Sequence, residues 1–189
     1  MEIIGGTSET LSAEVFERIA RYRHRVFIET LGWELPSHAG FELDQFDRPD
    51  TIYMAAREED GRLVGTARLL PTDRPYLLGE VFPQLMGGAE PPCRSDVWEL
   101  SRFAAVDFEE ACSHPLCQFS SPVTLALMGK VLRLAAANGV SRLITVSPIG
   151  VERLLRRGGF AAHRAAPPVV VNGQPLFACW IEVQGSLSS

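Results

Sequence analysis

The sequence lacks several patterns that would assign it to a class at once. No run of 18 consecutive apolar residues is present, and no basic stretch followed by an apolar segment stands at the N-terminus. Neither GxxxxGK[ST] nor a strand-borne GxGxxG pattern occurs, which disfavours a site for nucleotide phosphates. We therefore expect a cytoplasmic protein with no membrane span and no secretory signal.

Cysteine and histidine are scarce as well. The four cysteines, Cys93, Cys112, Cys117 and Cys179, show no CxxC spacing. Cys112 and Cys117 with His114 between them would be the one set of metal ligands, but reduced thiols are the simpler interpretation, so we expect no metal site. No Ser-His-Asp or Cys-His pattern is apparent, which disfavours a covalent enzyme intermediate.

Charge is unevenly distributed along the chain. The 189 residues carry a net charge of −5, and their 46% apolar and 22% charged content is typical of one globular domain. The window from Lys130 to Arg164 holds seven basic residues and one acid, Glu152, and is therefore +6, which leaves −11 for the remainder. A basic face on an acidic protein favours an acidic protein partner over nucleic acid, although a solvated arginine-rich helix face is the plain alternative.

Periodicity and turn residues predict the order of elements. We expect a helix over 11–29 capped by Thr7 or Ser8, an ordered loop over 36–50, and hairpins around Asp60-Gly61 and Asn172-Gly173. Between the hairpins we expect, in order, a short turn or helix over 78–85, a strand over 97–106, an irregular connection over 107–121, a helix over 124–138, a strand over 143–146 and a helix over 150–157. This order predicts an α/β sandwich with a mixed, mainly antiparallel sheet.

Polar residues interrupt the predicted strand Trp98-Glu99-Leu100-Ser101-Arg102-Phe103-Ala104. Simple alternation would turn Glu99, Ser101 and Phe103 to one face and Arg102 to the other. A carboxylate and a guanidinium in a buried strand indicate either a cleft or a structural ion-pair network.

Three further blocks carry similar chemistry. They are Arg23-His24-Arg25-Val26-Phe27 followed by Trp33, Glu42-Leu43-Asp44-Gln45-Phe46-Asp47, and Gly65-Thr66-Ala67-Arg68-Leu69-Leu70. In this order and spacing, the four blocks resemble the acyl-homoserine-lactone synthases of LuxI type, from about residue 15 to residue 182. The resemblance implies a single synthase domain over 1–189 with a GNAT-like three-layer sandwich. It also implies transfer of a fatty acyl group from acyl carrier protein to the amine of S-adenosylmethionine, which is a substrate, so that no cofactor is expected.

The resemblance assigns roles to residues of these blocks. The catalytic candidates are Glu99, Asp44, Arg102 and Ser101. The S-adenosylmethionine candidates are Arg23, Phe27, Trp33, Asp44, Asp47, Arg68 and Phe103. A general base is needed to deprotonate the attacking amine, and a partly buried carboxylate such as Glu99 suits that task. Which charge pairs with which substrate group stays open, and each residue could instead be structural.

The acyl chain requires an apolar pocket, for which the candidates are Leu125, Met128, Leu143, Thr145, Val146 and Leu155. Thr145 matches a family position that accompanies 3-oxoacyl preference, and we expect a medium-chain product. The +6 window predicts that the carrier protein docks on Arg153, Arg156 and Arg157. Two alternatives are considered. One is a GNAT-like N-acyltransferase that uses acyl-CoA and another amine, although no clear pyrophosphate loop is present. The other is a lactone-binding regulator, but such a protein needs a helix-turn-helix module, for which a chain filled by this domain has no room.

Overall fold

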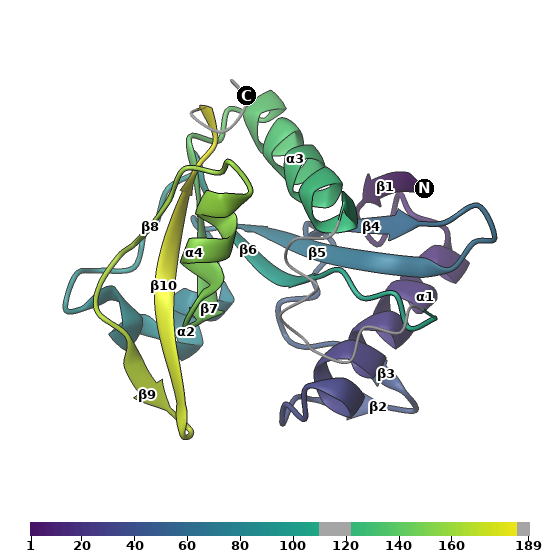
Figure 1. The fold of residues 1–189 in the computed structure, drawn as a ribbon, viewed down its shortest axis with the longest axis horizontal. Coiled ribbons are helices and arrows are strands. Elements are labelled where there is room, and N and C mark those ends of the chain that lie inside the picture. The colour runs from purple at the N-terminus through teal and green to yellow at the C-terminus, as the bar shows by residue number, and fades with distance from the viewer. Residues whose placement is uncertain (110–121, 185–189) are drawn as a thin grey trace. The chain divides into compact units, whose positions relative to one another are not determined.

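The computed structural model describes residues 1–109 and 122–184, and they form two compact units. Unit 1 draws on the ranges Met1–Arg68 and Arg102–Leu127, and unit 2 on Leu69–Ser101 and Met128–Ser189. Strands β5 (Leu63–Pro71) and β6 (Val97–Ala104), which are labelled in Figure 1, belong partly to each unit by their residue ranges. The predicted mixed, mainly antiparallel sheet flanked by helices is confirmed.

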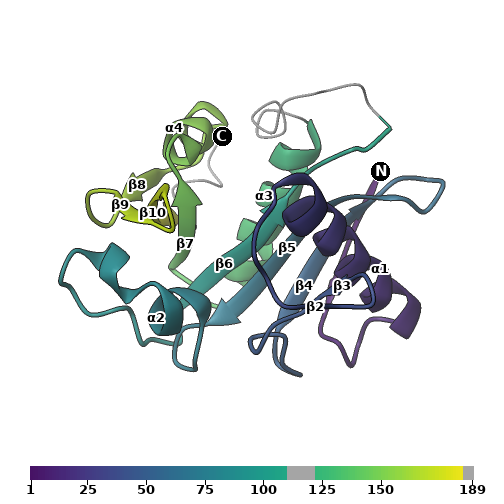
Figure 2. The same cartoon turned by 90° about the horizontal axis from the view of Figure 1, so that it is seen from below.

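Unit 1 has three layers. Its other strands are β1 (Glu2–Gly6), β4 (Ile52–Arg57) and the short pair β2 (Ser37–His38) and β3 (Phe41–Glu42), and β1 pairs antiparallel with β4. Helix α1 (Ala13–Arg23) lies across one face of β4, where Ile19 packs on Tyr53 and Ala55 (Figure 2). A Cβ placed on Gly65 of β5 would meet Leu127 of α3 (Pro122–Ala137) at 3.2 Å, so the part of α3 that belongs to unit 1 packs on the opposite face.

Helix α1 differs from its predicted form at both ends. Its N-cap is Ser12, whose Oγ accepts a hydrogen bond from the Val15 N–H at 3.3 Å, so the predicted caps Thr7 and Ser8 are wrong. After Arg23 the chain continues as a π-helix, η1 (His24–Thr30). A π-helix is rare and is often found at functional sites.

Unit 2 is built around the strand β10 (Gln174–Glu182). It pairs antiparallel with β7 (Arg142–Pro148), β8 (Ala162–Arg164) and β9 (Val169–Val171), while β6 pairs parallel with β7. The short helices are α2 (Leu77–Val81), the 3₁₀ turn η2 (Pro83–Met86) and α4 (Val151–Arg157).

Both predicted hairpins are confirmed. Asn172 and Gly173 have φ of 49° and 77°, as a two-residue turn with left-handed residues requires, and Gly61 has φ of 88°. The sequence patterns missed β1 and β8, and the predicted loop over 36–50 contains β2 and β3. Most of the predicted connection over 107–121 lies outside the described residues.

Candidate active site

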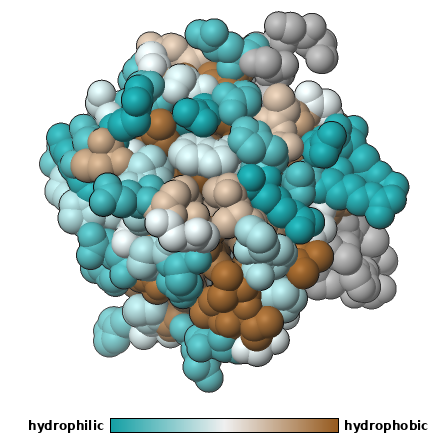
Figure 3. All heavy atoms as spheres, turned by 90° about the vertical axis from the view of Figure 1, so that its left-hand side faces the viewer, coloured by the Kyte–Doolittle hydropathy of each residue, from teal (hydrophilic) through white to brown (hydrophobic). Residues whose placement is uncertain are grey.

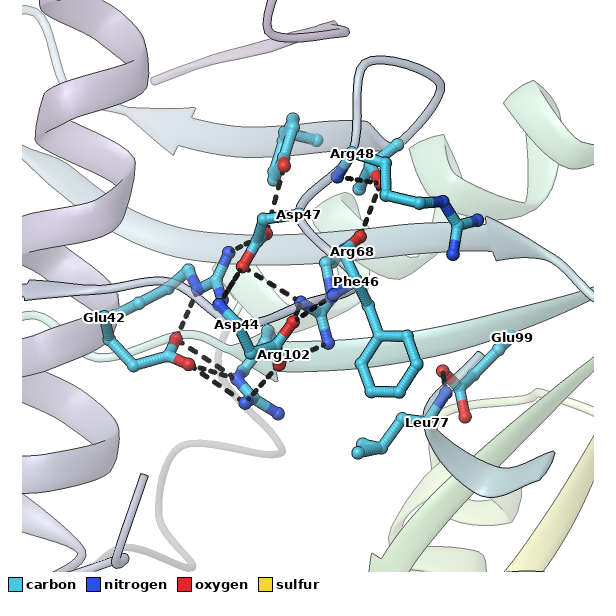
Figure 4. Close-up of polar contacts among 12 residues, drawn as sticks. Glu42, Asp44, Phe46, Asp47, Arg48, Arg68, Leu77, Glu99 and Arg102 are labelled. Atoms are coloured by element: carbon cyan, nitrogen blue, oxygen red, sulfur yellow. Dashed lines mark hydrogen bonds and ion pairs between the residues drawn. The ribbon is translucent and has the colours of Figure 1, made fainter. Parts of the chain in front are cut away.

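Six charged residues of unit 1 form one closed set of ion pairs, which we call the ion-pair ring (Figure 4). Three are arginines and three are carboxylates, so the formal charge of the set is zero. The members are Arg23 at the end of α1, Glu42 in β3, Asp44 and Asp47 in the loop after β3, Arg68 in β5 and Arg102 in β6.

Two carboxylates of the ring bridge to Arg102. Glu42 Oε2 accepts from Arg23 Nε at 2.6 Å, and Glu42 Oε1 lies 2.9 Å from Arg102 Nη2. Asp44 contacts the same Arg102 Nη2 at 2.9 Å and accepts from Arg68 Nη1 at 2.6 Å. Each carboxylate therefore joins two guanidinium groups.

Asp47 closes the ring. Its Oδ1 accepts from Arg23 Nη1 at 2.7 Å, and its Oδ2 lies 3.2 Å from Arg68 Nη1. Tyr53 also donates its hydroxyl proton to Asp47 Oδ1 at 3.0 Å, and the backbone N–H of Asp44 donates to Oδ2 at 2.7 Å. Positive and negative groups thus alternate around the whole ring, and Tyr53 supports it from β4.

The ring is buried, and its charges stabilise one another. The six side chains are between 0% and 5% exposed. Burial alone would raise the pKa of Glu42, but Arg23 and Arg102 lower it below its usual value. Burial likewise opposes ionisation of Asp47, yet hydrogen bonds and charge from Arg23 and then Arg68 hold its pKa well below the usual range. Both carboxylates are therefore ionised in the folded protein at neutral pH.

These shifts predict a stability that falls in acid. Because the pKa values of Glu42 and Asp47 are lower in the folded than in the unfolded chain, their contribution is complete above the unfolded values, at about 4. It is lost as pH falls further, since the unfolded chain then takes up protons that the folded chain does not. We expect the urea midpoint to decrease steeply between about pH 5 and pH 3. A constant midpoint over that range would contradict this role of the ring.

Arg102 differs from the other two arginines of the ring. Arg23 uses all three of its side-chain nitrogens on Glu42 and Asp47, whereas Arg102 Nη1 has no hydrogen-bond partner in the described ranges. Arg102 also has φ of 50°, which is unusual for a residue other than glycine and interrupts the alternation predicted for this strand. Strained backbone of this kind is concentrated at functional sites.

Aromatic residues of unit 1 lie beside Arg102. Phe27 of η1 stacks on Trp33 with ring centroids 5.1 Å apart, and the Arg102 guanidinium lies 5.7 Å from the Phe27 ring centroid. Phe27 is buried, and Trp33 and Phe103 are partly buried. The structure therefore brings the candidates Phe27 and Trp33 together beside Arg102 of the ring.

Glu99 is positioned within unit 2 by backbone donors. Its Oε2 accepts from the Leu77 N–H at 3.1 Å and its Oε1 from the Leu78 N–H at 2.7 Å, at the start of α2 (Figure 4). The Glu99 side chain is fully buried, and its neighbour Ser101 is 7% exposed. Both oxygens of the carboxylate thus help to hold the first turn of α2, a role that the sequence did not indicate.

The six candidates for the acyl pocket do not all fit one surface. Met128, Leu143, Thr145 and Leu155 are buried, whereas Leu125 is 39% exposed on α3. Thr145 and Val146 are consecutive in β7 and therefore point to opposite faces of the sheet. A pocket on one face of the sheet can be lined by Thr145 and Leu143, and a pocket on the other face by Val146. One pocket cannot be lined by all three residues. Within the described ranges, the Thr145 hydroxyl makes one long contact, 3.5 Å to the Val146 carbonyl oxygen.

The predicted docking residues lie together on α4. Arg153, Arg156 and Arg157 are exposed and, with Glu152, line a hollow of about 320 Å³. Glu152 pairs with Arg164 at 2.7 Å and lies 3.8 Å from Arg156, while Arg153 and Arg157 have no carboxylate partner among the residues described.

Figure 3 views the side on which β8 and β10 lie, where polar surface surrounds an apolar patch. Val170 of β9 is 70% exposed.

The sequence predicted neither a metal site nor a membrane span. In the described parts of the chain, no group of three or more His, Cys, Asp or Glu residues could hold a metal ion. Cys112, His114 and Cys117 lie outside those parts, and Cys93 and Cys179 are free thiols. None of the helices in the described ranges is long and apolar enough to cross a membrane.

Glu42 is the site residue that the sequence interpretation missed. It was noted only as part of a block, yet it is fully buried and joins Arg23 to Arg102. Its spacing of two from Asp44 could have been a signal, because alternate residues of an extended segment share a face.

A buried network of charges beside an arginine with strained backbone is typical of an enzyme site. The sequence model of the autoinducer synthase family matches residues 7–185, and the chain belongs to this family. It is 49% identical over 183 residues to an acyl-homoserine-lactone synthase of Acinetobacter nosocomialis, covering 97% of this chain and 100% of that protein. The chain is therefore an acyltransferase that acts in autoinducer synthesis for quorum sensing.

Solved structures confirm the GNAT-like fold. A crystal structure of TofI in a ternary complex with an inhibitor and MTA has a TM-score of 0.82 and 41% identity, and it covers 97% of this chain and 92% of that chain. A CoA-dependent acyl-homoserine lactone synthase, BjaI, with SAM and isopentyl-CoA has a TM-score of 0.84 and 27% identity, covering 98% and 84%.

Proposed function

We propose that this synthase transfers a fatty acyl group from acyl carrier protein to the amine of S-adenosylmethionine. The amine nitrogen attacks the thioester carbonyl carbon and the carrier thiolate leaves. The substrate carboxylate then attacks the carbon that bears the sulfonium, and methylthioadenosine leaves as the lactone closes. The similarity to structures that hold MTA and SAM supports this choice of amine substrate. Since the family model spans residues of both units, we propose that they act as one synthase domain.

The observation that carries the proposal is that Arg102 Nη1, a hydrogen-bond donor, has no partner among the described residues. A substrate carboxylate is an acceptor for guanidinium N–H groups, and Nη1 is the Arg102 nitrogen that the ring leaves unused. The stacked pair Phe27 and Trp33 offers aromatic surface to the sulfonium or the adenine. Asp44 and Asp47, which could face cationic groups of the substrate, are engaged with arginines of the ring and act mainly by holding Arg102 and Arg68 in place.

Glu99 is the proposed general base. The ammonium group of the substrate must lose a proton before it can attack, and a carboxylate acting through a water can accept that proton. Ser101, two residues along β6, is proposed to assist at the same step. We propose that no cofactor takes part, because the sulfonium is already a good leaving group.

Mass spectrometry of the ether extract of an expressing culture tests the proposal directly. We expect an N-acyl-homoserine lactone with a medium-length acyl chain, and 3-oxo substitution would agree with a polar contact from the buried Thr145 hydroxyl. An extract without any such lactone, from cells that contain the folded protein, would contradict the proposal.

Arg102→Lys should weaken use of S-adenosylmethionine more than use of the acyl donor. Lysine keeps the charge but loses the forked donor geometry, and a charge-assisted hydrogen bond contributes about 1.5–3 kcal/mol. We therefore expect KM for S-adenosylmethionine to rise by about tenfold or more. Steady-state kinetics with each substrate varied in turn measures this, and Arg18→Lys, at an exposed pair with Glu14, is the control. A rise confined to KM for the acyl donor would show that Arg102 contacts the acyl donor and not S-adenosylmethionine.

Carrier-protein docking is the proposed role of Arg153, Arg156 and Arg157. Carrier proteins are acidic, and two of these arginines have no carboxylate partner among the described residues. We expect Arg153→Glu with Arg157→Glu to raise KM for acyl carrier protein by about tenfold or more at low salt while kcat changes little, because rim charges act mainly on association. Arg133→Glu on α3 is the control for the change of charge.

The acyl-CoA alternative gives a different result in the same assay. BjaI is described as CoA-dependent, so both donors should be compared at equal concentration. Equal turnover with acyl-CoA and acyl carrier protein, unaffected by the reversal of charge at Arg153 and Arg157, would replace the carrier protein with CoA as the donor.

A further inference from the structure

Among the described residues of unit 1, one buried polar side chain has no hydrogen-bond partner. Thr66, in the middle of β5, is 1% exposed, and its Oγ1 makes no hydrogen bond within the described ranges. Thr72, which is also buried, shows the usual arrangement, because its Oγ1 lies 2.9 Å from the carbonyl oxygens of both Arg94 and Val97. A buried hydroxyl without a partner destabilises the folded state, so its presence requires an explanation.

The direction of the Thr66 side chain follows from its neighbour. A Cβ on Gly65 would lie 3.2 Å from Ala56 Cβ and 3.2 Å from Leu127 of α3, so Gly65 faces α3. Successive residues of a strand face opposite ways, and Thr66 therefore faces the other side of the sheet. Arg68, two residues further on, shares that side and belongs to the ion-pair ring.

The same side of the sheet is covered by apolar residues of α1 and η1. Ile19 packs on Tyr53 and Ala55 of β4, and Phe27 packs in one cluster with Ala104 of β6. The Gly65 backbone adjoins the carbonyl of Ala104, at 3.3 Å from an added Cβ, which places this part of β5 beside that cluster. Thr66 thus shares this side of the sheet with an apolar cluster and with Arg68 of the ring.

The groups on this side of the sheet indicate which ligand the hydroxyl would take. The carboxylates of the ring are already bridged to arginines, whereas Arg102 Nη1 is an unused donor and the Thr66 hydroxyl is another. An ionised carboxylate accepts several hydrogen bonds and donates none, so it suits a pair of donors.

We propose that Thr66 contacts the substrate, with its hydroxyl donating a hydrogen bond to the carboxylate of the amino-acid end of S-adenosylmethionine. This inference rests on the proposed function, in which Arg102 binds the same carboxylate. The Thr66 hydroxyl then has no hydrogen-bond partner in the free enzyme and gains one in the complex. It therefore strengthens substrate binding and lowers the stability of the free protein.

Thr66→Val separates these two effects because valine has nearly the same shape and lacks the hydroxyl. We expect the melting temperature of the free protein to rise by about 2–4 °C, since an unpaired polar group is removed. The affinity for S-adenosylmethionine, measured by calorimetric titration, should fall by about tenfold. KM for the acyl donor should stay unchanged, and Thr66→Ser, which keeps the hydroxyl, should bind like the unsubstituted chain.

Thr72→Val is the matched control, because its hydroxyl is already bonded. It should lower the melting temperature and leave the S-adenosylmethionine affinity unchanged. An unchanged affinity in Thr66→Val, with the unsubstituted chain binding normally, would overturn the role of Thr66 and leave the proposed function intact. A lowered melting temperature in Thr66→Val would also overturn it, because the hydroxyl would then have a partner in the free protein. Absence of binding by the unsubstituted chain would overturn both.

Discussion

Replacing Glu99 with glutamine is expected to reduce lactone synthesis by about 10²–10⁴-fold, the usual effect of losing a general base. Glutamine has the same size, but it presents an amide NH₂ group in place of one acceptor oxygen. One of the two hydrogen bonds from the Leu77 and Leu78 N–H groups is therefore lost as well. That loss leaves a backbone N–H group without its acceptor and should lower the free energy of unfolding by about 1–3 kcal/mol, so the protein stays folded.

The role of Glu99 in holding α2 can be separated from its role as a base. Leu77 is the first residue of α2, a position that tolerates proline, and Tyr76 before it has extended backbone angles. Leu77→Pro thus removes one donor to Glu99 while the carboxylate remains. We expect Leu77→Pro to retain most of the activity that Glu99→Gln loses. Equal losses in the two variants would show that Glu99 acts by positioning α2 and would remove it from the proton transfer.

Removing one member of the ion-pair ring is expected to have the largest effect on stability. Glu42→Ala leaves Arg23 Nε and Arg102 without their shared carboxylate in a fully buried position. Breaking a buried ion pair by truncating one partner destabilises by about 3–5 kcal/mol, because an uncompensated charge stays behind. Urea or thermal unfolding at pH 7 measures the change.

Glu14→Ala provides the comparison for Glu42→Ala. Glu14 pairs with Arg18 at 2.6 Å, as short as the Glu42 contact, but both side chains are exposed, at 73% and 48%. Exposed pairs contribute little to stability, and we expect the unfolding midpoint to stay nearly unchanged. A similar small change for Glu42→Ala would mean that water reaches the ring, and the assignment of a buried network would be wrong.

Local patterns predicted much of the fold because they depend on near neighbours. The Asn172-Gly173 turn is one example, since both residues take the left-handed angles that such a hairpin needs. The family blocks likewise identified five of the six ring residues. The short strand β8, with three residues, carries too little periodicity to be recognised from the sequence.

The pairing within the ring could not be predicted in the same way. Glu42 is 19 residues from Arg23 and 60 from Arg102, and no spacing rule connects side chains so far apart in the chain. The positive φ of Arg102 is imposed by its surroundings, because arginine itself has no preference for that conformation. The change from α1 to the π-helix η1 also has no clear signal in the residues.

The closed form of the ion-pair ring has a consequence for how its members can vary. Every member has two partners of opposite sign, so the effects of substitutions at these positions should not be additive. Loss of Arg23 alone, for example, leaves Glu42 and Asp47 each with one arginine, whereas loss of Arg23 together with one of them restores neutrality. Among related chains, the six residues should therefore be retained together. A functional relative that has lost one carboxylate of the ring should also have lost one arginine of it.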